Sequence, residues 1–104
     1  MTYTILVREC NRNRLPNRRP NVSFSFEFEG HGYRATAGWF PGGGLAEVFL
    51  DTSKAGTPLQ HNAKTAAILA SIALQHGVEP QTLLHSVHGP IAIAIDHFTK
   101  VEVL

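Results

Sequence analysis

The clearest pattern in the chain is a strict alternation of apolar and polar side chains over residues 22–29. Valine and phenylalanine occupy the even positions, and serine and glutamate the odd ones, in the run Val22-Ser23-Phe24-Ser25-Phe26-Glu27-Phe28-Glu29. A period of two places the four apolar residues on one face of a β-strand. Gly30-His31-Gly32 follows and predicts a tight reversal, because glycine adopts positive φ without a steric cost.

Two more strands are predicted directly after this reversal. Residues 33–40 are rich in aromatic and small side chains, and residues 45–50 place Leu45, Glu47 and Phe49 on the side opposite Ala46, Val48 and Leu50. Pro41-Gly42-Gly43-Gly44 between them could cradle a phosphate, but phosphate loops normally lead into a helix, so we interpret this segment as a hairpin turn. Short links favour an antiparallel meander with one face free for helices to cover.

The apolar spacing changes to three and four after Thr57, which predicts helices. Thr57 is suited to an N-cap, Pro58 to the first turn and Gly77 to the stop, giving a helix from 58 to about 76. One face of this helix carries small residues: Ala63, Ala66, Ala67, Ala70, Ala73 and Leu74. A second helix is predicted from Pro80 to Gly89, with Leu83, Leu84 and Val87 facing inward. Residues 90–100 fit either a strand, from their alternating isoleucines, or a helix beginning at proline.

Composition and charge indicate one small globular domain with a basic extension. The chain has 104 residues, 43% of them hydrophobic and 16% charged, which is enough for a single core. The net charge is only +1, yet five of the nine Lys+Arg fall between Arg8 and Arg19. We therefore expect a basic arm over residues 1–20 and an α+β domain over 21–104. The sequence contains no membrane-length apolar run and no secretory signal, so we expect a cytoplasmic protein with no membrane partner.

No catalytic constellation is visible in the sequence. The single cysteine, Cys10, cannot form an intrachain disulfide or a thiolate zinc site. His85 and His88 are three residues apart on the predicted second helix and could share a metal ion with Asp96-His97. The alternative is that they are polar residues near a helix C-terminus, where the helix dipole favours a protonated histidine without any metal. Ser71 has no activating neighbour, and we expect its hydroxyl to bond to the preceding helical turn. We expect no metal and no cofactor.

Binding residues are predicted from charge and aromatic character. The arginines of the arm could contact nucleic acid, a nucleotide phosphate or an acidic partner, although a solvated extension accounts for them equally well. Tyr33 and Trp39 on the second strand could form a base-stacking platform or could pack in the core. The candidate binding residues are Arg14, Arg18, Arg19, Arg34, Trp39 and Lys54.

Several strings in the chain resemble one known family in their order and spacing. They are Arg14-Leu15-Pro16-Asn17-Arg18-Arg19, Leu45-Ala46-Glu47-Val48-Phe49-Leu50 followed by Lys54-Ala55-Gly56, Ala70-Ser71-Ile72-Ala73-Leu74-Gln75-His76-Gly77-Val78, and Gly89-Pro90-Ile91-Ala92-Ile93-Ala94-Ile95-Asp96. The sequence resembles the TSCPD domain, a module at the C-terminal end of adenosylcobalamin-dependent (class II) ribonucleotide reductases and in related short proteins of bacteria and phages. The resemblance implies a three-stranded antiparallel meander, two helices and a short terminal helix, all packed on one sheet face.

The resemblance also implies a link to ribonucleoside-diphosphate reduction, as a non-catalytic accessory or binding module. An alternative is a subunit or fragment that takes part in the reductase reaction through Cys10, and a weaker one is a nucleic-acid-binding domain that uses the arm. Independent reduction is not expected, because it needs a radical-bearing cysteine and a reducing dithiol. Expected partners are a ribonucleotide reductase or another nucleotide enzyme, a nucleotide or nucleic acid at the arm, and a second copy in a homodimer paired through the second strand or the arm-proximal strand.

Overall fold

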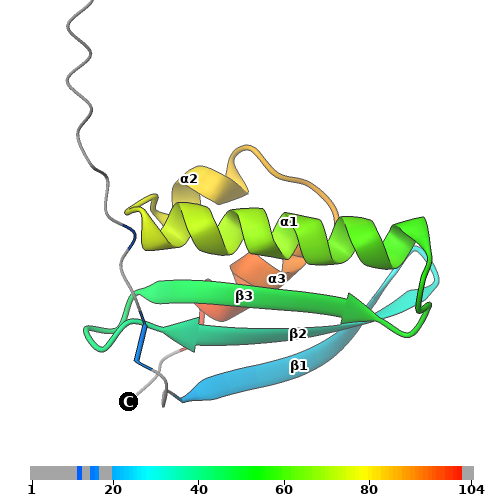
Figure 1. Ribbon diagram of the computed structural model, residues 1–104, viewed down its shortest axis with the longest axis horizontal. Helices are drawn as coiled ribbons and strands as arrows, with labels where there is room; N and C mark the ends of the chain where they lie inside the picture. The colour runs from blue at the N-terminus through cyan, green and yellow to red at the C-terminus, as the bar shows by residue number, and fades with distance from the viewer. Residues whose placement is uncertain (1–11, 13–14, 17–19, 102–104) are drawn as a thin grey trace, which may run out of the picture.

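In the part of the chain that the structure describes, three antiparallel strands form one sheet and three helices cover one of its faces (Figure 1). This computed structural model describes residues 12, 15–16 and 20–101. The strands are β1 (Asn21–Phe28), β2 (His31–Trp39) and β3 (Leu45–Thr52), and the helices are α1 (Pro58–Gln75), α2 (Pro80–Leu84) and α3 (Pro90–Thr99). The predicted α+β meander with helices on one face is confirmed.

A two-residue turn at Glu29 and Gly30 joins β1 to β2. Both residues have positive φ, 50° and 78°, as a type I′ hairpin turn requires, and Phe28 pairs with His31 to close it. The reversal predicted at residues 30–32 is therefore wrong in position, because His31 already belongs to β2. The predicted alternation of β1 is confirmed, since its three phenylalanines are half-buried against the core.

β2 is the central strand of the sheet, because the strand order is β1-β2-β3. The expectation that β2 offers an edge to another copy is therefore wrong: its backbone is bonded on both sides. Residues 40–44 form the predicted hairpin turn, in which the Phe40 amide donates to the Gly44 carbonyl at 2.8 Å. A bulge at Gly38/Trp39 then shifts the register and pairs Trp39 with Leu45. Leu45 consequently lies in the core and not on the side of Glu47 and Phe49.

α1 packs along β3 and covers part of its free edge. The Ser71 hydroxyl accepts the Val48 amide at 2.9 Å and can donate to the Val48 carbonyl at 2.9 Å or the Ala67 carbonyl at 2.8 Å. One turn later, the Gln75 side chain donates to the Ala46 carbonyl at 3.1 Å. The predicted bond from Ser71 to its preceding turn is confirmed. The two side chains also satisfy edge groups that would otherwise be open to another strand.

α2 is shorter than predicted, and this removes the helical spacing on which the possible metal site at His85 and His88 depended. The helix ends at Leu84, where the Ser86 amide closes a tighter turn onto the Leu83 carbonyl at 2.9 Å. His85 is the C-cap and His88 lies in the following loop, so the two do not share a helical face. No group of three or more His, Cys, Asp or Glu among the described residues could hold a metal ion.

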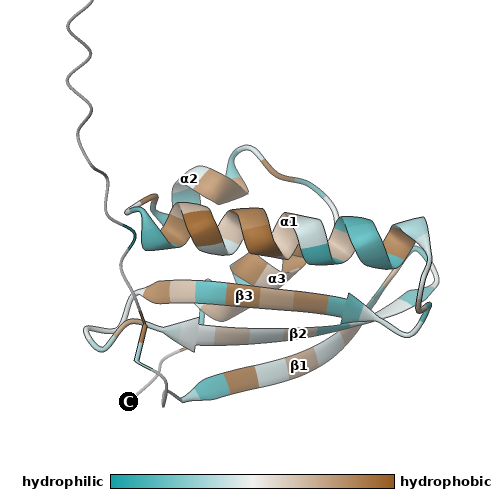
Figure 2. Ribbon diagram, viewed as in Figure 1, coloured by the Kyte–Doolittle hydropathy of each residue, from teal (hydrophilic) through white to brown (hydrophobic). Residues whose placement is uncertain are grey.

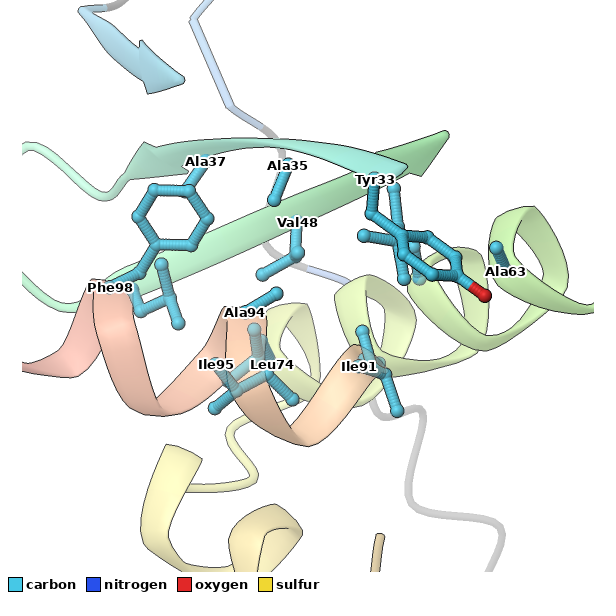
Figure 3. Close-up of a cluster of buried hydrophobic side chains, with 14 of the residues drawn as sticks. Tyr33, Ala35, Ala37, Val48, Ala63, Leu74, Ile91, Ala94, Ile95 and Phe98 are labelled. Atoms are coloured by element: carbon cyan, nitrogen blue, oxygen red, sulfur yellow. The ribbon is translucent and has the colours of Figure 1, made fainter. Parts of the chain in front are cut away.

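α3 is a helix, as the resemblance implied, and it fills the centre of the core. Its buried residues are Ile91, Ala94, Ile95 and Phe98, a helical spacing that the alternating isoleucines concealed. Phe98 is fully buried and meets Phe24 and Trp39 edge to face, with ring centroids 5.2 and 5.9 Å away. Figure 3 shows the alanines of β2 and Val48 of β3 facing these α3 side chains. Among the described helices, none has the length and hydrophobicity needed to cross a bilayer.

Candidate functional site

The predicted binding residues do not form one group in the structure. Arg14, Arg18 and Arg19 lie outside the described residues. Trp39 is 6% exposed and Tyr33 is 4% exposed, so neither ring offers a stacking surface to a base. Arg34 lies on the opposite face of β2 from Trp39, and Lys54 is exposed in the loop between β3 and α1. A binding role for these residues stays a prediction, and Arg34 has the most informative surroundings.

Arg34 lies on the central strand, on the sheet face that the helices leave uncovered. Side chains alternate along β2, and Tyr33 and Ala35 point toward the helices, so Arg34 points the other way. The register places it between Ser25 of β1 and Asp51 of β3. Figure 1 shows all three helices on the far side of the sheet from this face. The guanidinium is therefore presented to solvent from a central, rigid strand.

Arg34 is exposed and makes no ion pair with any carboxylate that the structure describes. Asp51, its cross-strand neighbour, is engaged elsewhere: its Oδ1 accepts the Thr52 amide at 2.8 Å and the Gln60 side-chain amide at 2.9 Å. The bond from Gln60, followed by that from Thr52, lowers the pKa of the Asp51 carboxyl below its ordinary value. The site therefore holds a fixed carboxylate beside an arginine whose donors remain available.

Phe49 is an exposed aromatic ring on the same face. It is 52% exposed and pairs with Thr36, so it lies diagonally from Arg34 across two strands. Ile68 of α1, 55% exposed, extends the apolar area over the edge of β3. Figure 2 shows that the middle of α1 is hydrophobic. Phe49 and Ile68 are not among the binding residues predicted from the sequence, although the alternation in residues 45–50 does place Phe49 on the opposite side from the core-facing Val48.

Two hollows meet at Arg34 and Asp51. One, of about 570 Å³, extends toward the β1–β2 hairpin and is also lined by Ser25 and Glu27. The other, of about 450 Å³, extends toward α1. We call the whole area the Arg34 surface; its members are Ser25, Glu27, Arg34, Phe49, Asp51, Lys64 and Ile68. At the opposite end of the same sheet face Gly38 and Glu47 are buried, which confines the exposed surface to the Arg34 end.

The Arg34 surface combines both signs of charge with exposed apolar side chains. Arg34 and Lys64 are cationic, and Glu27 and Asp51 are anionic. Arginine and aromatic residues are enriched at the centres of protein interfaces, whereas nucleic-acid surfaces are dominated by positive charge. The arrangement can form hydrogen bonds to a partner's acceptors around an apolar centre. Its lining residues include no thiol.

Comparison with known proteins identifies the family. The TSCPD domain model matches residues 8–101. A vitamin B12-dependent ribonucleotide reductase of Streptantibioticus cattleyicolor is 41% identical over 71 residues, which are 68% of this chain and 12% of that protein. The corresponding protein of Rhodopirellula baltica is 28% identical over 84 residues, which are 81% of this chain and 8% of that protein. That of Agrobacterium fabrum is 34% identical over 67 residues, which are 64% of this chain and 5% of that protein.

The similarity to these reductases is thus confined to a small region of each one. The chain spans no more than 12% of the length of the curated relatives named above. No solved structure matches it significantly. Because the family model matches residues 8–101, which is nearly the whole chain, this protein belongs to the TSCPD domain family.

Proposed function

We propose that this protein is a non-catalytic accessory module of ribonucleoside-diphosphate reduction, and that it binds a B12-dependent ribonucleotide reductase through the Arg34 surface. The observation that carries the proposal is the uncommitted guanidinium of Arg34, presented from the central strand beside the exposed ring of Phe49. The relatives carry a similar region within a B12-dependent ribonucleotide reductase, which supports a reductase as the partner.

A protein partner fits this surface better than a polyanion does. The carboxylates of Glu27 and Asp51 flank Arg34 within the same hollow, and they would repel the phosphates of a nucleic acid. A protein partner can instead place a carboxylate or carbonyl against Arg34 and an apolar side chain against Phe49. Arginine and aromatic residues in such positions carry a large share of the binding energy in many interfaces.

The test is calorimetric titration of the full chain into a purified B12-dependent ribonucleotide reductase. Arg34→Glu and Phe49→Ala should each weaken binding by about tenfold or more, the loss typical of a residue at the centre of an interface. Arg34→Glu also reverses a charge, so it should slow association at low salt.

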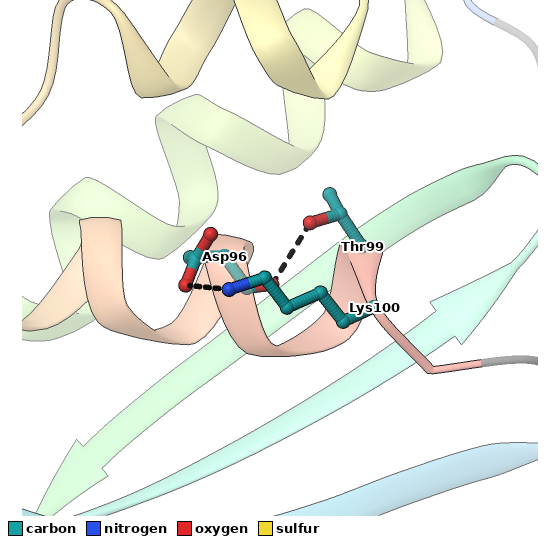
Figure 4. Close-up of polar contacts among 3 residues, drawn as sticks. All are labelled: Asp96, Thr99 and Lys100. Atoms are coloured by element: carbon teal, nitrogen blue, oxygen red, sulfur yellow. Dashed lines mark hydrogen bonds and ion pairs between the residues drawn. The ribbon is translucent and has the colours of Figure 1, made fainter.

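Matched controls come from α3 and its C-cap residue, on the other side of the sheet. Lys100→Glu reverses a cation whose partner is Asp96, at 3.0 Å in an exposed pair one turn apart (Figure 4). Ile93→Ala truncates an apolar residue that is 36% exposed. Both controls should bind within about twofold of the wild type, because neither residue lies on the Arg34 surface and the exposed Lys100–Asp96 pair contributes little to stability. Equal binding by all four variants, or no binding by the wild-type chain, would refute the proposal.

A further inference from the structure

β1 is an edge strand whose outer side has no backbone hydrogen-bond partner in the described part of the chain. The strand order leaves one edge of the sheet at β3 and the other at β1, which lies along the lower border in Figure 1. At the β3 edge, Ser71 and Gln75 of α1 supply hydrogen bonds to the backbone. The backbone bonds of β1 are those of its ladder with β2. The inference below rests on this difference and not on the proposed function.

The outward backbone groups of β1 belong to its odd-numbered residues. Phe28 and His31 close the two-residue turn, so they form a pair that exchanges both backbone bonds. Bonded pairs alternate along an antiparallel ladder, so the even residues of β1 bond to β2 and the odd ones direct their amides and carbonyls away from it. The outward residues are Asn21, Ser23, Ser25 and Glu27. They form a row of donors and acceptors that fits a second extended strand.

β1 lacks the features that normally keep an edge strand from pairing. Its eight residues include no proline, lysine or arginine, and its register with β2 runs without a bulge. Its aromatic side chains are held in place by ring stacking. Phe24 stacks on His97 with centroids 3.7 Å apart, and Phe26 stacks on Tyr33 at 5.5 Å. The edge is therefore regular, ordered and open to another strand.

We propose that β1 pairs antiparallel with β1 of a second copy, about a two-fold axis at Ser25, which joins the two sheets into one of six strands. The strand is self-complementary in this register. Phe24 lies opposite Phe26 of the other copy, and Val22 lies opposite Phe28 of the other copy. All four apolar residues of β1 thus face apolar residues, and aromatic pairs across strands are favourable.

Other registers fit less well. Moving the axis by one residue in either direction leaves a terminal apolar residue of β1 opposite a residue outside the strand. An axis at Glu27 places two carboxylates opposite each other, which is destabilising. With the axis at Ser25, Glu27 lies opposite the uncharged Ser23. The helices of both copies then lie on one side of the joined sheet, and both Arg34 surfaces lie on the other.

The test is sedimentation velocity of the full chain over a range of concentrations, combined with hydrogen exchange of the ¹⁵N-labelled chain. The sedimentation coefficient should rise with concentration toward that of a dimer. The amides of Ser23, Ser25 and Glu27 should gain protection over the same range, whereas those of Phe24 and Phe26, bonded to β2, should be protected throughout. A chain that stays monomeric, or a dimer in which the odd residues stay unprotected, would overturn the proposal.

Ser25→Pro tests the edge without breaking the ladder to β2, because it removes an outward amide. Ser25 lies on the two-fold axis, so each dimer loses two hydrogen bonds, and association should weaken by at least about tenfold. Ser25→Thr is the matched control, which keeps the amide and should associate within about twofold of the wild type. The amide spectrum of Ser25→Pro shows whether the fold is retained.

Ser25→Glu is an independent variant that keeps the amide. It sets two carboxylates opposite each other, so association should weaken, with part of the loss recovered at high salt. Thr65→Glu adds the same charge at an exposed position of α1 and should leave association unchanged. Wild-type association by both Ser25→Pro and Ser25→Glu would refute the pairing. Protection of the odd residues that appears only when a B12-dependent ribonucleotide reductase is added would assign the edge to a strand of that partner, and would likewise refute pairing with a second copy.

Discussion

Replacing Ser71 with alanine should destabilise the protein by exposing the edge of β3. Ser71 is 6% exposed, and its hydroxyl accepts the amide of Val48, a residue with no exposed surface, at 2.9 Å. Without it, a buried backbone donor loses its partner, at a cost of about 1–3 kcal/mol. The higher helix propensity of alanine offsets about 0.5 kcal/mol. The net loss in free energy of unfolding should be about 0.5–2.5 kcal/mol.

Urea denaturation measures this loss, with Thr65→Ala as the matched control. Thr65 is exposed on the same helix, so its replacement changes helix propensity without removing a buried partner, and stability should stay within about 0.5 kcal/mol of the wild type. Hydrogen exchange adds a local readout, because the Val48 amide should exchange faster only in Ser71→Ala. If the two variants were equally stable and the Val48 amide kept its protection, the reasoning about edge coverage would be refuted.

Three other substitutions test separate parts of the fold. Because the pKa of Asp51 is lowered in the folded protein, the bonds to its carboxylate stabilise the fold at neutral pH and are lost as pH falls through the folded pKa. In urea denaturation, the difference in free energy of unfolding between the wild type and Asp51→Asn should therefore shrink from pH 7 toward pH 3, and a constant difference would contradict this. A Cβ at Gly38 would lie 3.0 Å from the buried Glu47 side chain, so Gly38→Ala should lower the free energy of unfolding by about 1–2 kcal/mol. An unchanged melting temperature would show that the Glu47 side chain moves freely. The His31 Nδ1 is buried without a partner in the described structure, so His31→Leu should raise stability by up to about 1–2 kcal/mol, and a loss would reveal a bond to that nitrogen.

Much of the fold could be predicted because its signals are local. The alternation in β1, the hairpin at residues 40–44 and the cap at Thr57 each depend on a few neighbouring residues. The cap is present in the structure, where the Gln60 amide donates to the Thr57 hydroxyl at 3.4 Å. Turn and cap chemistry act within the segment itself, so the sequence is sufficient to recognise them.

Features that depend on tertiary contact were not predicted. Glu47 is 5% exposed although alternation puts it on the uncovered face, and the role of Gln75 becomes clear only once α1 lies along β3. The core position of Leu45 depends on a bulge that shifts the register by one residue. α3 was ambiguous because its isoleucines satisfy both a period of two and a helical stripe, and only the family resemblance favoured the helix.

Of the residues that form the Arg34 surface, only Arg34 was predicted from the sequence as a binding residue. Arg34 and Trp39 were both predicted as binding residues, but they are five positions apart on one strand, so their side chains lie on opposite faces of the sheet. Phe49 is near Arg34 only through the β2–β3 register, which aligns Arg34 with Asp51. The Arg34 surface is assembled from three strands and a helix, so it can be identified only in the three-dimensional structure and not from any single segment of the sequence.

Cross-saturation NMR tests the central claim most directly. The deuterated, ¹⁵N-labelled chain is mixed with an unlabelled B12-dependent ribonucleotide reductase, the reductase is irradiated, and the amides that lose intensity mark the contact surface. We predict the largest losses at Arg34, Phe49 and Asp51, with α2 and α3 little affected. Losses concentrated on the helical side, or none at all at saturating reductase, would contradict it.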